Sequence, residues 1–143
     1  VTTPMNPGSQ GNDGSFGRLF PYISGDNDAK SKVAMTTPVF MEDDASNAAG
    51  QMGFVIPKDV AADGTPVPTG SKVKLNSRPG GRFAVVRFAG RLNDQTRAEN
   101  TEQLRQWMKR KGLQSAASPE YAGYDPPWTP GPFRRNEILI RLN

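Results

Sequence analysis

The first hydrophobic pattern along the chain is helical. Four apolar side chains recur at the spacing i, i+3, i+4 and i+7, which places them on one helix face: Phe16, Leu19, Phe20 and Ile23. Ser15 is a suitable N-cap for this helix, and Gly25 stands where a C-terminal glycine cap belongs. Pro21 lacks a backbone donor and is expected to kink or shorten the helix.

A second helix is predicted from Asn93 or Asp94 to about Lys111, with Gly112 as its stop signal. Its expected inner face consists of Ala98, Thr101, Leu104, Trp107 and Met108. The basic run 109–111 falls at the helix end, where cations complement the helix dipole. We therefore interpret this run as structural and do not predict a nucleic-acid site there.

Alternating apolar positions predict strands in the remaining chain. The predicted strands cover residues 1–5, 32–41, 52–56, 73–75, 82–88 and 137–142. Segment 82–88 is apolar on both faces, which indicates a central strand. Residues 58–71 and 119–128 are rich in turn-forming residues and are predicted to be loops. Segment 1–14 is a polar, glycine-containing lead-in without a phosphate-binding motif.

The order of these elements predicts one α+β domain spanning residues 1–143. Two helices and five or six strands, without a regular βαβ alternation, favour a mostly antiparallel, curved sheet with flanking helices. A chain of 143 residues is long enough to bury a core of its own. It begins at Val1 and not at Met, so we expect that its start has been processed or trimmed.

Composition excludes several kinds of chemistry. The chain has no cysteine and no histidine, which rules out Cys- or His-dependent nucleophilic catalysis and the common His- or Cys-ligated metal sites. Residues 42–44, Glu-Asp-Asp, do not continue any calcium-loop spacing and are interpreted as a solvated loop. The net charge is only +4, and no apolar stretch is long enough to span a membrane.

The chain has more aromatic and methionine side chains than two short helices need for packing. They are Phe16, Phe20, Met35, Phe40, Met41, Phe54, Tyr124, Trp128 and Phe133. Each of them alone would be interpreted as a core residue. The set as a whole suits an apolar pocket for a flat ligand, since burial of apolar area and stacking on aromatic rings both contribute affinity.

Five segments, taken together and in order, resemble the SOUL haem-binding protein family. They are residues 16–25 (FGRLFPYISG), 32–39 (KVAMTTPV), 54–57 (FVIP), 82–90 (RFAVVRFAG), and 123–127 (GYDPP) followed by 134–137 (RRNE). The resemblance covers about residues 14–143. It implies a distorted β-barrel flanked by two helices, similar to gyrase-inhibitor-like effector-binding domains.

The resemblance further implies non-covalent binding of haem or another tetrapyrrole in an apolar groove beside the first helix. Matched by position, the groove is expected to be lined by Phe16, Leu19, Phe20, Ile23, Met35, Met41, Tyr124 and Trp128. Arg18, Arg134 and Arg135 are the expected partners of the propionates. The ligand would be buffered, transported or delivered without chemical change, so no catalytic residue and no protein-bound metal is predicted.

Two departures from the family pattern matter. The additional N-terminal strand that the family implies is missing or reduced to residues 1–5, and trimming it would open one edge of the barrel. Some members also offer a histidine to the iron, and this chain has none, so the affinity would come mainly from burial and propionate pairing. The sequence indicates neither the compartment nor the oligomeric state.

Two other functions stay open at this point. A small-molecule hydrolase of the gyrase-inhibitor-like type would need a carboxylate or phenol that activates water. The plausible candidates for that role are Glu120, Tyr121, Tyr124 and Glu137. The third function is a protein-interaction module that keeps only a vestigial groove.

Overall fold

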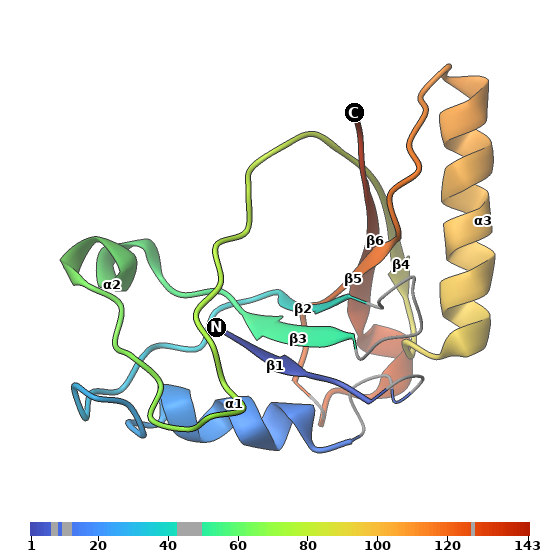
Figure 1. Ribbon diagram of the computed structural model, residues 1–143. Helices are drawn as coiled ribbons and strands as arrows, with labels where there is room; N and C mark the ends of the chain where they lie inside the picture. Colours follow the sequence, from blue (N-terminus) through green and yellow to red (C-terminus); the bar gives the residue numbers. More distant parts are fainter. Residues whose placement is uncertain (7–8, 10–12, 43–49, 127) are drawn as a thin grey trace.

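The computed structural model describes residues 1–6, 9, 13–42, 50–126 and 128–143 (Figure 1). Six strands form one antiparallel sheet in the order β1-β3-β2-β5-β6-β4. The strands are β1 (Thr2–Pro4), β2 (Val39–Glu42), β3 (Gln51–Phe54), β4 (Phe83–Ala89), β5 (Glu120–Gly123) and β6 (Arg135–Arg141). The helices are α1 (Ser15–Ile23), α2 (Lys58–Asp63), α3 (Asp94–Arg110) and a 3-10 turn, η1 (Gly131–Phe133). The predicted α+β class is confirmed, but the sheet is open and does not close into a barrel.

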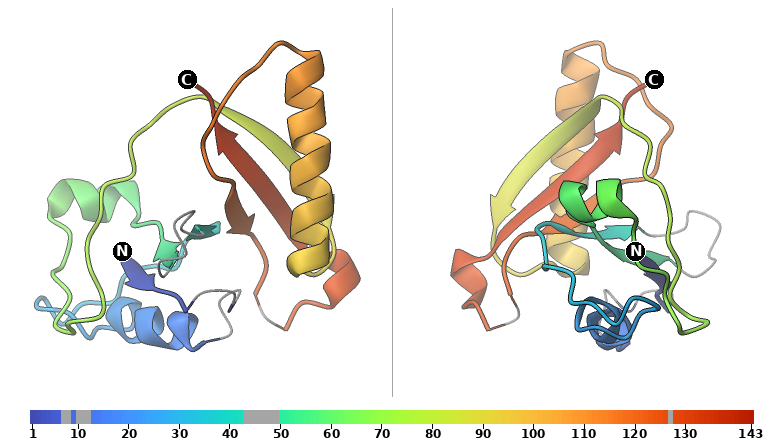
Figure 2. Two further views of the ribbon diagram at one scale, coloured as in Figure 1. Left: turned by 45° about the vertical axis from the view of Figure 1, so that its right-hand side comes forward. Right: turned by 90° about the vertical axis from the view of Figure 1, so that its left-hand side faces the viewer.

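Both long helices cover the same face of this sheet. Residues directly opposite each other in an antiparallel pair share a face. The register aligns Met41 with Met52 on one side and with Tyr121 on the other, and Tyr121 with Ile138. All four side chains are buried in the core. Helix α1 packs on β1 and β3, and α3 packs on β4 and β6 (Figures 1 and 2).

Helix α1 begins one residue earlier than its caps predict. Gly14, at φ 81°, is the N-cap, and Ser15 is the first helical residue. The Asp13 carboxylate does the capping, because it accepts from the Ser15 backbone N–H at 3.0 Å. Pro21 lies in the last turn and the helix still continues to Ile23. The expected helix is confirmed, and only the capping residue is corrected.

Helix α3 is confirmed from its Asn93 cap onward. The Asn93 side chain accepts from the Thr96 N–H at 2.9 Å, and the Thr96 hydroxyl accepts from the Asn93 N–H at 3.0 Å, which is a capping box. The buried residues of α3 are Arg97, Leu104 and Met108. The predicted inner face was therefore wrong for Ala98 and Trp107, which are exposed.

Several strand predictions require correction. The predicted strand 32–41 is reduced to Val39–Glu42, and the segment before it is irregular. Residues 73–75 form only an isolated bridge between Lys74 and Thr2. Helix α2 and strand β5 occur in segments that were expected to be loops. Strand β5 forms because β2 and β6 pair with it on both sides, and this pairing outweighs the local turn signals. Helix α2 is a six-residue helix without a buried residue.

Strand β4 lies at the edge of the sheet, not at its centre as expected. One of its faces packs under α3 and carries Ala84, which is buried. On the other face, the Phe83 ring is covered by two guanidinium groups, those of Arg78 and Arg141. Val85, on that same face, is 45% exposed. The apolar pattern of β4 thus reflects local covering of its two faces and not a central position.

Candidate functional site

Helix α1 presents a flat apolar surface to solvent. Phe16, Gly17, Phe20 and Pro21 occupy one side of the helix, at spacings of one and four residues. We call these four residues the α1 platform. Phe20 is 48% exposed, Gly17 and Pro21 are exposed, and Phe16 is partly buried. Gly17 and Pro21 lie beside the two stacked phenylalanine rings and add few protruding atoms to this surface.

The platform is supported from below by the core. The Phe16 and Phe20 rings stack with centroids 5.9 Å apart and planes 24° apart. Phe16 also meets the buried ring of Phe54, on β3, edge-on at 5.3 Å. At Gly17, no atom lies within 4 Å of the position that a Cβ would occupy. The rings are therefore held in place while the space above Gly17 stays open.

Three of the residues expected to line the groove face the core instead. Leu19 is 0% exposed, Ile23 is 7% exposed and Met41 is 8% exposed. A ligand could reach them only after rearrangement, so their expected role in lining the groove stays a prediction that this arrangement does not support. They belong to the side of α1 and β2 that holds the helix on the sheet. Met35, by contrast, is 44% exposed in the connection that leads to β2.

Arg18 joins α1 to the segment that precedes it through hydrogen bonds and an ion pair. Its guanidinium donates to the carbonyl oxygens of Pro4 at 2.6 Å and Asp13 at 3.0 Å, and it forms an ion pair with the Asp13 carboxylate at 3.3 Å. Burial alone would raise the pKa of Asp13, but hydrogen bonds from Ser15, Asn6 and Arg18 outweigh it and lower this pKa to about 2. Arg18 is bonded to these partners in the structure, so its expected role as a propionate partner gains no support from this arrangement and stays a prediction.

The aromatic residues predicted near the C-terminus lie on a different element, the connection between β5 and η1. In Figures 1 and 2 this connection runs down toward the level of the N-terminal end of α1. Trp128 is 83% exposed there, and Phe133 of η1 is 78% exposed. The Arg134 Nε donates to the Thr129 carbonyl oxygen at 2.8 Å. This contact stabilises the connection internally.

Tyr124 and Arg135 are brought together with Glu137. The Tyr124 hydroxyl donates to Glu137 at 2.7 Å, and Arg135 donates to Glu137 at 2.6 Å. The Arg135 guanidinium also lies 4.2 Å from the centre of the Tyr124 ring. Burial alone would raise the pKa of Glu137, but these two hydrogen bonds outweigh it and lower that pKa.

This geometry gives no support to the hydrolase hypothesis. A carboxylate whose pKa is lowered is a weaker general base, and both donors near Glu137 are already bonded to it. Glu120 forms an ion pair with Arg78. Tyr121 is buried beneath Arg97, whose guanidinium lies 3.9 Å from the ring centre. In the part of the chain that the structure describes, no three Asp or Glu side chains gather as a metal site would require.

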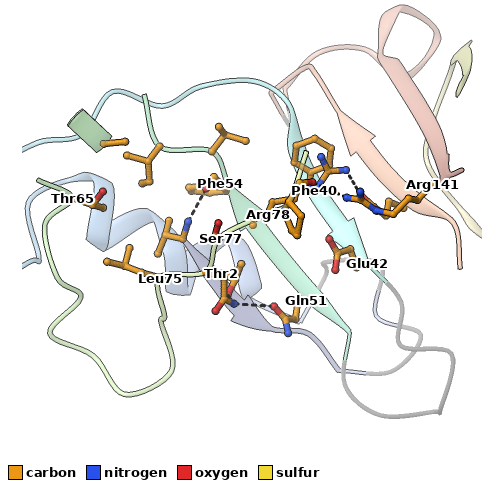
Figure 3. A pocket seen from close by; sticks show the side chains of 18 residues that line it. Thr2, Phe40, Glu42, Gln51, Phe54, Thr65, Leu75, Ser77, Arg78 and Arg141 are labelled. Carbon is orange, nitrogen blue, oxygen red and sulfur yellow. Dashed lines mark hydrogen bonds and ion pairs between the residues drawn. The ribbon is translucent and has the colours of Figure 1, made fainter. Parts of the chain in front are cut away.

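A separate hollow lies on the sheet face opposite the helices (Figure 3). Its volume is about 1120 Å³. It is bounded by β1, β2 and β3, by the ends of β5 and β6, by Ala61 of α2 with Thr65 just after it, and by the segment 75–79, which crosses the face. The sequence did not reveal this hollow, because its walls come from seven separated segments. The one available signal was the alternation in β2, which places Phe40 and Glu42 on the same face.

Comparison with known proteins identifies the family. The sequence model of the SOUL heme-binding protein family matches residues 1–141. This chain belongs to the SOUL heme-binding protein family. It is 28% identical to "Heme-binding protein 1" of Xenopus laevis, over 88% of this chain and 68% of that protein. It is 27% identical to "Heme-binding protein 1" of Xenopus tropicalis, with the same two coverages.

The resemblance predicted from the five segments is thus confirmed for this SOUL chain. The residues expected to bind the ligand are not tested by the comparisons, and they remain predictions. Residues 43–44 of the acidic run lie outside the described residues. Among the helices of the described residues, none is long and apolar enough to cross a membrane.

Proposed function

We propose that this SOUL chain binds haem or a closely related tetrapyrrole non-covalently on the α1 platform. The protein would hold the ligand for buffering, transport or delivery and would not change it chemically. The observation that carries the proposal is the Phe20 ring, 48% exposed beside the open position at Gly17. Membership of a family described as heme-binding supports this choice of ligand.

The energetics of the platform suit a planar macrocycle. Apolar area removed from water contributes about 25 cal/mol per Å². A ring lying across Phe16, Gly17, Phe20 and Pro21 would bury the exposed part of this surface without first displacing core side chains. Because Phe16 rests on Phe54, little ordering of the protein would oppose binding.

The iron would receive no histidine or cysteine ligand, since the chain contains neither residue. Affinity therefore depends on the macrocycle and not on the metal. Arg18 is committed to Asp13 and Pro4, and Arg135 to Glu137, so we expect the propionates to extend toward solvent. Haemin and iron-free protoporphyrin IX are expected to bind with similar affinity.

Titration of the purified protein with both ligands tests this proposal. We expect saturable changes in the Soret band with dissociation constants that agree within about threefold. Phe20→Asp places a charge at the centre of the platform and should abolish binding of both, while circular dichroism shows whether the fold is kept. Two results would contradict the proposal: no binding at tens of micromolar, where about −6 kcal/mol would be detected, or normal binding by the folded Phe20→Asp variant.

A further inference from the structure

The two edges of the sheet differ in how they are covered. The edge strands are β1 and β4. The outer side of β1 is covered by the segment that crosses it, because Thr2 and Lys74 exchange backbone hydrogen bonds of 2.8 and 2.9 Å. The outer side of β4 forms the margin of the sheet in the right-hand view of Figure 2. No backbone hydrogen bond joins that side to another segment among the described residues.

The free edge of β4 carries a regular row of backbone donors and acceptors. The Leu142 N–H donates to the Arg82 carbonyl oxygen at 2.9 Å, and the Gly90 N–H donates to that of Arg134 at 3.0 Å. Such bonded pairs recur at every second residue of an antiparallel ladder. The even-numbered residues of β4 therefore bond β6, and the odd-numbered ones direct their N–H and C=O groups outward. The outward residues are Phe83, Val85, Arg87 and Ala89.

Strand β4 lacks the features by which edge strands usually avoid pairing with other strands. Its seven residues include no lysine and no proline. Its register with β6 is continuous from Phe83 to Ala89, so it contains no bulge. Val85 is 45% exposed, and Arg87 and Ala89 are exposed as well. Another strand can therefore add to the sheet at this edge.

The sequence of β4 is complementary to itself in the antiparallel direction. With Val86 opposite Val86 of a second copy, all four outward residues pair and form about eight hydrogen bonds, two for each bonded pair. On the face that carries α3, the small Ala84 then meets the large Phe88 of the second copy. On the other face Arg87 meets Val85, so the two Arg87 charges are not opposed. A register centred on Val85 or on Arg87 pairs fewer of the outward residues.

Helix α3 has an exposed aromatic ring on the same side of the molecule. Arg105 donates to the Ala117 carbonyl oxygen at 3.1 Å, in the segment that leads back to β5. Residues two positions apart on a helix are separated by about 200°. Trp107, which is 40% exposed, therefore lies on the flank of α3 that faces away from β5. Because α3 packs on β4, a second copy joined at β4 would bring its own α3 beside this flank.

We propose that two copies of this SOUL chain pair through β4, antiparallel and centred on Val86, so that one continuous sheet runs through both copies. The partner that fits this edge is a second copy of the same chain, and Trp107 is covered where the two α3 helices meet. The α1 platform lies over β1 and β3, at the far end of the sheet, and stays open in both copies. The pairing does not depend on tetrapyrrole binding.

Sedimentation equilibrium of the full chain at neutral pH, from about 1 to about 300 micromolar, tests the proposal. We expect the average mass to rise with concentration from that of one chain toward that of two. Val85→Pro removes an outward donor without removing a hydrogen bond to β6, so it should weaken dimerisation at least about tenfold. Val85→Thr is the matched control, because it keeps both the donor and the branched side chain, and it should dimerise as wild type does.

Cysteine substitution tests the register, since the chain has no cysteine of its own. Directly opposed residues in a non-hydrogen-bonded pair have Cα atoms about 4.5 Å apart, a separation that a disulfide can span. Val86→Cys should therefore link two copies on mild oxidation, which gives a dimer band on a non-reducing gel. Val85→Cys lies opposite Arg87 of the second copy and should link at least about tenfold more slowly.

Phe20→Asp separates this proposal from the function of the α1 platform, because it should dimerise as wild type does whether or not haemin binds. If Val85→Pro does not fold, as judged by circular dichroism, the two cysteine variants decide. A wild-type chain that stays monomeric over the whole range would leave the edge to a strand of another protein and overturn the proposal. Normal dimerisation by folded Val85→Pro, loss of it in folded Phe20→Asp, or linking of Val86→Cys no faster than Val85→Cys would overturn it too.

Discussion

Truncation of Phe20 to alanine gives the most quantitative test of the α1 platform. A phenylalanine side chain offers roughly 200 Å², so its 48% exposure leaves about 95 Å² available for a ligand to cover. At about 25 cal/mol per Å², complete covering contributes about 2.4 kcal/mol. That is roughly a 50-fold change in affinity. Part of the ring edge would stay wet in the complex, so we expect haemin affinity to fall about 10- to 50-fold.

The assay is a haemin titration followed in the Soret band, run in parallel on wild type and variant. Val67→Ala is the matched control, because Val67 is similarly exposed, at 53%, but lies in the connection after α2. It should bind haemin as wild type does. If Phe20→Ala binds within twofold of wild type, the platform does not hold the ligand, and the reasoning from exposed area is refuted.

Four further variants, at three positions, test the arrangement around α1. Gly17→Leu should block haemin binding, because its side chain would fill the open space above the platform. A Gly17→Leu variant that binds haemin normally would contradict the site. Gly17→Ala should raise the free energy of unfolding by roughly 0.5–1 kcal/mol, because alanine favours the helix more than glycine does. Leu19→Ala should lower the free energy of unfolding in urea by about 2–5 kcal/mol, and a loss below about 1 kcal/mol would contradict its core position. Asp13→Asn should cost about 1–2 kcal/mol at neutral pH. The folded pKa of Asp13, about 2, lies below its ordinary 3.8, so this difference should be complete above about pH 5 and should shrink as pH falls through 3.8 toward and below 2. A difference that is the same at pH 2 as at pH 7 would refute it.

Sequence reasoning succeeded where the signal is local. The stripe Phe16, Leu19, Phe20 and Ile23 defined α1, and the Asn93 cap defined the start of α3, because helix periodicity and capping depend on residues a few positions apart. The same stripe could not show which rings face solvent. Leu19 is buried and Phe20 half exposed, although both were placed on one face, since the boundary between core and surface depends on how α1 sits on β1 and β3.

Long-range strand pairing explains the sequence-based predictions that were wrong. Strand β5 lies within a turn-rich sequence and forms because β2 and β6 pair with it on both sides. The position of β4 at the edge follows from strand order, which hydrophobicity alone does not encode. The interaction partners of the arginine side chains were equally hard to predict from the sequence. Arg78 pairs with Glu120, 42 residues away, which only the fold brings near. Arg18 pairs with Asp13, five residues before it, but it also bonds the Pro4 carbonyl oxygen, which no sequence pattern indicated.

Strand β3 separates the core beneath α1 from the hollow on the opposite face of the sheet. Its alternate residues point to opposite sides, so Phe54 supports Phe16 beneath α1 while Gly53, and Val55 just after the strand, border the hollow on the opposite face of the sheet. A molecule that shifts this four-residue strand from one side changes the shape presented on the other. Thermodynamic linkage makes any such influence mutual: the factor by which a molecule in the hollow alters haemin affinity is the factor by which haemin alters the affinity for that molecule.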